Sequence, residues 1–170
     1  NWSLIDSTYY EDRVNLEKID FTKNITHGPN DLGFDYSYGH SGSLDMPPYV
    51  YVENEKITGK INRVIEDKGE YSWFRKGPTA DDFIHDQVTP HFFNKAHEFI
   101  KEKFEENKPF FLYLPLPSPH TPILPTKDWK GKSELNEYAD FVMLFDHHMG
   151  KLNNLLKELN ISENTMIIFT

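Results

Sequence analysis

The chain has 170 residues, a formal net charge of −9 and no cysteine, and 15% of its residues are aromatic. This length suits one domain with a substantial core, and the aromatic content excludes a disordered chain. The acidic balance, without a cluster of lysine and arginine to offset it, excludes a nucleic-acid interface; disulfides and cysteine-ligated zinc are excluded, and the longest apolar stretch is too short to span a membrane.

The first half of the chain is rich in turn signals. Residues 1–48 show no sustained period of 2 or 3.6, but they contain many glycine, proline and asparagine positions. The β-branched and aromatic residues 49–52 predict a short strand, and residues 56–58 a second one, so the pair forms a small hairpin. The sequence therefore predicts a loop-rich segment over residues 1–88 that contains one hairpin.

A helix is predicted over residues 90–106. Thr89 suits the N-cap, Pro90 suits the first turn, and apolar side chains then recur at helical spacing. They are Phe93, Ala96, Ile100 and Phe104. The apolar run 110–114 follows and ends in prolines, as a buried strand followed by a loop would.

A second helix is predicted to begin at Ser133 and to continue to Leu159. Its apolar positions step by threes and fours, and they are Tyr138, Val142, Phe145, Met149, Leu152, Leu156 and Leu159. At the edge of this stripe, Asp146 is expected to accept hydrogen bonds from a neighbouring loop. Residues 165–169 then form a second apolar run, which predicts another buried strand.

Two apolar strands joined through a helix form a βαβ unit, which implies a mainly parallel sheet with helices on its faces. The fold class is therefore α/β, with a loop-rich N-terminal half. A parallel pair needs further strands to bury both faces of the sheet. We therefore expect residues 1–170 to be the central fragment of a single larger domain, divided into the loop-rich segment 1–88 and a helix-strand-helix-strand segment 89–170.

A histidine in a proline-rich turn is the strongest candidate for chemistry. Ligands collect at the carboxyl ends of strands in open α/β sheets, and Pro119, His120 and Pro122 follow the predicted strand 110–114. The prolines restrict the backbone around His120, so its imidazole is held in one direction and loses little conformational entropy when it binds a ligand. Five other histidines are interpreted as packing or surface residues, because their spacing does not favour a shared metal: His85, His91, His97, His147 and His148.

Seven motifs occur in one order along the chain: Gly33–Tyr36, Ser43–Tyr49, Lys108–Leu114, Pro119–Pro122, Trp129–Ser133, Tyr138–Asp140 and Asn164–Thr170. Together they resemble the middle of a type I sulfatase, and the first two resemble its arylsulfatase branch. The resemblance implies part of an alkaline-phosphatase-like sulfatase domain.

The resemblance can be carried over at two positions. His120 matches the family's histidine in a Pro-His-x-Pro turn, which gives a hydrogen bond or positive charge to a sulfate oxygen, so it is expected to be catalytic and substrate-binding. Ser43 falls where arylsulfatases often place a serine near the substrate sulfate, so it is expected to be substrate-binding. The family's formylglycine nucleophile and its calcium ion are implied for the parent protein, but the residues that supply them lie outside this segment, and no metal ligand is predicted within it.

The predicted function is hydrolysis of sulfate esters by the full-length protein, a sulfuric ester hydrolase, whereas the segment alone is expected to be inactive. The implied partners are a sulfated small molecule or glycan and the remainder of the sulfatase domain. By resemblance, the protein is expected to be exported, to a periplasm, the extracellular space or a lysosome. Two alternatives stay open: a phosphodiesterase or phosphonate hydrolase of the same superfamily, and a non-catalytic module that binds sulfated glycans or self-associates.

Overall fold

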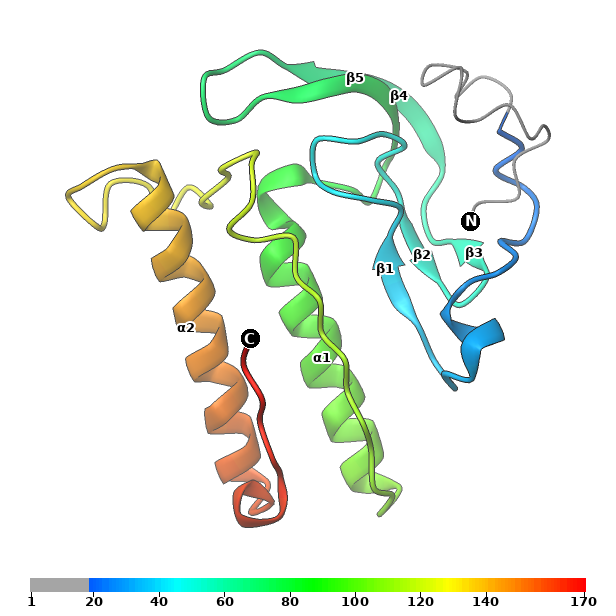
Figure 1. Cartoon of the computed structure of the whole chain (residues 1–170), viewed down its shortest axis with the longest axis vertical. Helices are drawn as coiled ribbons and strands as arrows, with labels where there is room; N and C mark the ends of the chain where they lie inside the picture. The colour runs from blue at the N-terminus through cyan, green and yellow to red at the C-terminus, as the bar shows by residue number, and fades with distance from the viewer. Residues whose placement is uncertain (1–18) are drawn as a thin grey trace. The chain divides into compact units, whose positions relative to one another are not determined.

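The computed structural model describes residues 19–170 (Figure 1). Residues 1–18, with which the predicted loop-rich segment begins, lie outside the described part of the chain. Contacts divide the protein into two compact units, Asn1–His85 and Asp86–Thr170. The described part of the first unit carries the strands, and the second unit carries the two long helices.

The first unit contains a three-stranded antiparallel sheet. Strands β1 (Tyr38–His40), β2 (Tyr51–Glu53) and β3 (Lys56–Ile57) lie in that order, with Gly39 opposite Val52 and Val52 opposite Ile57. The β2–β3 pair confirms the predicted hairpin. β1 extends this sheet and was not expected from the sequence.

Two further strands, which the sequence pattern did not reveal, form a second antiparallel sheet. They are β4 (Ile61–Asp67) and β5 (Phe74–Ala80), and their register shifts twice. No side chain of β4 is fully buried, so the strand lacks the alternation of apolar and polar residues by which strands are recognised. Gly77 and Pro78 break the pattern in β5 as well.

Aromatic side chains form the core of the first unit. Tyr49 and Tyr51 are almost completely buried, and the ring of Phe83 lies 5.9 Å and 4.7 Å from theirs. The Phe74 ring stacks on the imidazole of His85 at 3.9 Å. Burying such large rings contributes roughly 1.5–3 kcal/mol each, enough to hold short strands together.

The first long helix, α1, spans Val88–Glu105 and confirms the predicted helix. It begins two residues earlier than expected, with Gln87 at the N-cap in place of Thr89. Pro90 is tolerated because it lies in the first turn, where backbone N–H groups have no partner inside the helix.

The second long helix, α2, spans Glu137–Glu158 and begins four residues after the predicted start at Ser133. Glu134 has a φ of 56°, which a right-handed helix does not allow. Asn136 instead caps the helix, because its side chain accepts a hydrogen bond from the Ala139 N–H at 2.9 Å. Among residues 19–170, neither helix is apolar enough over its length to cross a membrane.

The two helices share an apolar core. Its buried members are Phe93, Ala96, Ile100, Leu152, Leu155 and Leu156. The predicted α2 stripe is confirmed at Leu152 and Leu156 but is wrong at Tyr138 and Val142, which are 51% and 39% exposed. Phe141 is buried instead, in a second cluster with Leu144 and Ile123.

The strands predicted at residues 110–114 and 165–169 are not hydrogen-bonded strands in the structure. The first run is extended beside α1 (Figure 1), and alternate residues, from Phe110 to Leu116, pack on the helical core. The residues between them face outward, with Phe111 76% and Tyr113 67% exposed. Neither run pairs with a strand in the described part of the chain, because a ladder needs a neighbouring backbone and residues 19–170 supply none there.

Candidate functional site

His120 lies in a tight turn of the second unit, as the sequence predicts. Its backbone N–H donates to the Pro117 carbonyl at 3.1 Å, and its side chain is exposed. The peptide bonds before Pro119 and Pro122 are cis. The rings of Pro119 and Pro122 restrict the backbone on both sides of His120, and the imidazole is presented to solvent.

The imidazole of His120 is oriented by one hydrogen bond. Nδ1 lies 2.6 Å from the carbonyl oxygen of Thr121. Because a carbonyl can only accept, Nδ1 carries the proton in this arrangement, and Nε2 faces outward. Nε2 can then donate a hydrogen bond to an anion only when the imidazole is protonated and positively charged.

Two contacts fix the ends of the His120 turn. The hydroxyl of Ser118, before the histidine, is hydrogen-bonded to that of Thr89 in the first turn of α1. Ile123, after the histidine, is buried against Phe141 and Leu144 of α2. The turn is thus anchored to both helices of its unit, which keeps the imidazole in one place.

Ser43, the second predicted residue, lies in a loop of the first unit beside an ion pair between the buried carboxylate of Asp45 and the exposed side chain of Arg75. Its hydroxyl donates a hydrogen bond to Oδ1 of Asp45, and Oδ2 of Asp45 accepts one from Nη1 of Arg75. The Arg75 N–H and Nη1 also donate to the Asp45 carbonyl, both at 3.2 Å. Asp45 is 8% exposed, so the carboxylate is satisfied mainly by these two partners.

The electrostatics of this network keep Asp45 ionised. Burial acts to raise the pKa of its carboxyl, but the hydrogen bonds from Ser43 and Arg75 outweigh burial and hold the pKa below the ordinary value. The Arg75 guanidinium is itself placed by the Trp73 ring, whose centroid lies 4.9 Å away.

Strand β5 supports the Ser43 loop. The Tyr49 N–H donates to the Pro78 carbonyl at 2.9 Å, which fastens the end of the loop to the strand. A Cβ added at Gly77 would lie 2.0 Å from Cβ of Pro47, so only glycine lets the loop approach β5 this closely. The loop that carries Ser43 is therefore docked rather than free.

Neither predicted residue belongs to a metal site within the described chain. Residues 19–170 contain no group of three or more histidine, aspartate or glutamate side chains placed to hold a metal ion. Ser43 belongs to the first unit and His120 to the second.

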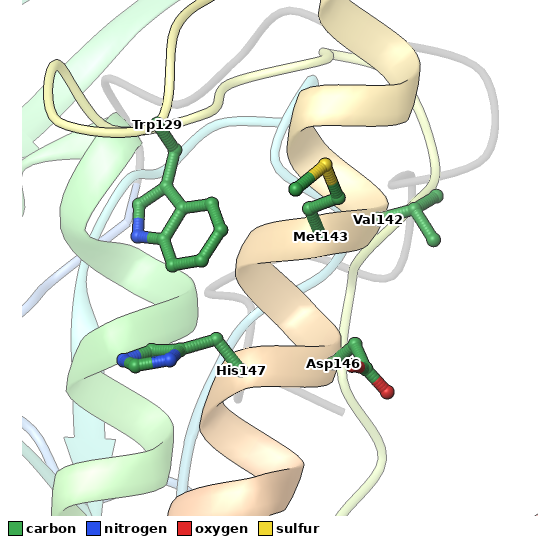
Figure 2. A pocket seen from close by; sticks show the side chains of 5 residues that line it. All are labelled: Trp129, Val142, Met143, Asp146 and His147. Atoms are coloured by element: carbon green, nitrogen blue, oxygen red, sulfur yellow. The ribbon is translucent and has the colours of Figure 1, made fainter. Parts of the chain in front are cut away.

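A shallow pocket of about 450 Å³ lies on the exposed face of α2 (Figure 2). It is lined by Trp129, Val142, Met143, Asp146 and His147. In Figure 2 the rings of Trp129 and His147 lie on one side of α2, with centroids 5.0 Å apart, and Asp146 lies on the other. The pocket contains neither predicted site residue.

The loop before α2 is organised by Asp140, which belongs to one of the motifs found in the sequence but for which no role was predicted. Its carboxylate is 2% exposed and accepts hydrogen bonds from the N–H groups of Gly131 and Ser133, both at 2.7 Å. The role expected for Asp146 is therefore played by Asp140, six residues earlier. The acidic residue four positions after the N-cap is the signal that could have identified it.

Comparison with known proteins identifies the family. The Sulfatase family model matches residues 13–170. An N-acetylgalactosamine-6-O-sulfatase of Bacteroides thetaiotaomicron is 29% identical over 89% of this chain and 36% of its own length. The N-acetylgalactosamine-6-sulfatase of Mus musculus is 34% identical over 81% of this chain and 26% of its own. A sulfatase of Formosa agariphila is 36% identical over 74% of this chain and 25% of its own.

A solved structure agrees with these relatives. It belongs to a study of glycosaminoglycan metabolism by Bacteroides thetaiotaomicron, and it superimposes with a TM-score of 0.72 at 25% identity over 86% of this chain. The likeness confirms the predicted α/β fold of a sulfatase domain. The chain covers 37% of that structure, and it spans about a third or less of each relative described above.

Proposed function

The chain belongs to the sulfatase family, and on that premise we propose that the whole protein hydrolyses sulfate esters. The match of the family model over residues 13–170 is the observation that carries this proposal. The reaction adds water across the ester and releases an alcohol and inorganic sulfate. Because the chain spans only part of its relatives, residues 1–170 alone are expected to be inactive.

In this proposal His120 is the catalytic residue that the chain supplies. The outward Nε2 of a protonated imidazole donates a hydrogen bond to a nonbridging sulfate oxygen and adds a positive charge beside it. Both interactions strengthen as negative charge develops in the transition state, so they lower the barrier. The hydrogen bond from Nδ1 to Thr121 supports this role, because it fixes the direction in which Nε2 points.

Ser43 is proposed to contact the substrate as well. Its loop is rigid, since Asp45, Arg75 and the close approach of Pro47 to Gly77 all hold it. A rigid loop positions a hydroxyl with little loss of entropy on binding.

The family's calcium ion and formylglycine do not fit the residues in hand. The described residues hold no metal cluster, and the chain has neither cysteine nor a Cys/Ser-x-Pro-x-Arg sequence from which the nucleophile could be made. In this proposal both groups come from the remainder of the protein. The residues described above act on the substrate's oxygen atoms and not on these groups.

The proposed substrates are sulfated sugars. Two of the relatives above are named for N-acetylgalactosamine 6-sulfate, and the structural neighbour belongs to work on glycosaminoglycans, which supports a carbohydrate over a steroid or simple aryl sulfate. We expect the protein to be exported, because such glycans are extracellular or lysosomal. Detection of the protein only in cytosolic fractions of its source cells would contradict this expectation.

The test compares the full-length protein with its His120→Ala variant on 4-nitrophenyl sulfate. Loss of one donor that acts in the transition state is expected to lower kcat on the order of 10²-fold. His91→Ala, on α1 and outside the turn, is the matched histidine control and should keep the wild-type rate. An equal rate for wild type and His120→Ala would reject the role of His120. Failure of the full-length protein to hydrolyse any sulfate ester, with turnover of a phosphodiester or of nothing, would reject the proposed reaction.

A further inference from the structure

The hydroxyl of Ser43 has only one proton, and the structure shows where it goes. A serine hydroxyl can donate one hydrogen bond and accept two. Ser43 donates to Oδ1 of Asp45, so its remaining capacity toward a ligand is that of an acceptor. A sulfate ester also presents only acceptors, because it is ionised at any physiological pH. Ser43 as it stands therefore has nothing to donate to a sulfate oxygen.

The polarity of the Ser43–Asp45 hydrogen bond cannot be reversed within this network. Reversal would need a proton on Asp45, and the carboxylate is kept ionised by Arg75, which donates to Oδ2 and to the backbone carbonyl of the same residue. Asp45 is buried, and Arg75 is stacked on Trp73. The ion pair between Asp45 and Arg75 thus makes Ser43 a hydrogen-bond donor toward Asp45 and an acceptor toward any other partner.

The same network fixes where the Ser43 lone pairs are. The Met46 N–H donates to the Ser43 carbonyl at 3.0 Å, which closes the turn that brings Ser43 and Asp45 together. The Ser41 hydroxyl donates to the Pro48 carbonyl at 2.9 Å across the same loop. A hydroxyl held by a closed turn and an ion pair is preorganised for one kind of partner.

From this arrangement we infer that Ser43 accepts a hydrogen bond from a hydroxyl or N–H group of the substrate, and that Asp45 and Arg75 are positioning residues that impose this polarity. The inference rests on the proposed function and refines it. Ser43 then recognises the sugar that carries the sulfate and not the sulfate itself. The loop selects sulfated sugars with free hydroxyl or amide donors over aryl sulfates that lack donors, such as 4-nitrophenyl sulfate.

The test measures a ratio of kcat/KM values on the full-length protein. N-acetylgalactosamine 6-sulfate offers donors, and 4-nitrophenyl sulfate offers none, while both carry the same reacting group. Ser43→Ala should lower the sugar-to-aryl ratio about five- to tenfold, the size expected for one hydrogen bond made in a site.

Asp45→Asn provides the test of positioning. The Arg75 guanidinium retains the amide oxygen, so the amide nitrogen faces Ser43 and donates to it, and the serine proton is released toward the ligand. The amide then occupies one of the two lone pairs of the Ser43 hydroxyl, so the ratio should fall, but by less than in Ser43→Ala. A merely structural role for Asp45 would lower both kcat/KM values and leave their ratio unchanged.

Ser72→Ala is the matched control, because Ser72 donates to Asp67 at 2.9 Å in the turn between β4 and β5, outside the Ser43 loop. Its ratio should equal that of the wild type.

Equal losses on both substrates in Ser43→Ala, or no loss on either, would overturn the inference. If the wild-type protein binds both compounds without hydrolysing them, the proposed reaction fails, and the ratio of the two dissociation constants decides the inference by the same criterion. Absence of any binding of the sugar sulfate would overturn both.

Discussion

The carboxylate of Asp140 accepts a hydrogen bond from the backbone N–H of Ser133 at 2.7 Å, and this contact ties the loop before α2 to the helix. The Gly131 N–H occupies the other carboxylate oxygen. A negative charge that satisfies two backbone donors is a stronger acceptor than a neutral one. The loop that carries Trp129 and Lys132 is therefore ordered from the helix side.

Asp140→Asn should release this loop. An amide can accept at only one of its two ends, so one of the two backbone N–H groups loses its partner. We expect faster hydrogen exchange at Gly131 or Ser133 and a lower thermal midpoint. Asp146→Asn, at an exposed position of the same helix, is the control and should leave both measurements unchanged. Unaltered exchange in Asp140→Asn would show that the loop is held by other contacts.

The hydrogen bonds of Asp140 also predict how the stability of the protein changes in acid. The hydrogen bonds from Ser133 and then Gly131 lower the pKa of its carboxyl from the ordinary value of 3.8. A carboxylate whose pKa is lower in the folded protein contributes stability above that ordinary value and loses it as the pH falls through the folded pKa. The unfolding free energy should therefore decrease below about pH 4 more steeply in the wild type than in Asp140→Asn.

Phe93→Ala should be the most damaging truncation in α1. Phe93 is 0% exposed, and its ring stacks on that of His148 at 5.2 Å. Removing a buried phenylalanine costs about 3–5 kcal/mol of unfolding free energy, because it leaves a cavity. Phe104→Ala is the matched control: Phe104 is 43% exposed, and its loss should cost less than about 1 kcal/mol. Urea unfolding that shows equal costs would contradict the packing described here.

His85 should make the first unit sensitive to mild acid. Burial lowers the pKa of its imidazole from 6.5 to about 4, since the charged form is poorly solvated beside Phe74. In the unfolded chain the same imidazole is protonated near pH 6.5, so acid favours unfolding. Stability is complete above pH 6.5, falls between pH 6.5 and about 4, and then levels off with respect to this group. His85→Phe should flatten that part of the pH profile, and a profile with the wild-type slope would contradict the account.

Gly77→Ala should disturb the loop that carries Ser43. The new Cβ would overlap Pro47, whose ring cannot rotate away, and overpacking of this kind costs roughly 1–3 kcal/mol. Gly39→Ala is the matched control in β1, where an added Cβ meets nothing within 4 Å, and its effect should stay within about 0.5 kcal/mol. Thermal unfolding of the two variants of the full-length protein makes the comparison. Equal midpoints would show that the loop can retreat from β5.

The outward residues of the segment 110–116 give a prediction about the whole protein. If the full-length protein supplies neighbouring strands, the amide N–H group of Tyr113 becomes hydrogen-bonded and should exchange slowly. In isolated residues 1–170 the same amide should exchange rapidly. Equal rates in the two proteins would reject the predicted parallel sheet at this position.

Local patterns were sufficient to predict the two long helices. The spacing of Phe93, Ala96 and Ile100 has the period of a helix, and the structure buries all three. The start of α2 was predicted wrongly because Ser133 and Asn136 are both good caps, and the backbone of Glu134 decides between them. Strand β4 was missed because none of its side chains is fully buried, and strand β5 was missed because Gly77 and Pro78 interrupt its pattern.

The candidate site likewise has one part that the local sequence predicts and one part that it does not. The prolines around His120 are adjacent in the sequence, so the rigid turn could be predicted. Arg75 lies 30 residues from Asp45, and no periodicity links the two. The partner of a buried carboxylate is chosen by tertiary structure, and only the fold reveals it.

The segment 110–116 has an inner face packed on the helices and an exposed outer face, and this difference suggests an order in which the protein folds. Its inner side chains pack on helices that are close in sequence, so that half of the unit can form early from local contacts. Phe111 and Tyr113 on its outer side, together with Met166 and Ile168, remain uncovered at that stage. Uncovered apolar, strand-like surface drives intermolecular association and is what chaperones shield. If further strands of the full-length protein cover this surface, a chain in which they are not yet in place is expected to be prone to intermolecular association.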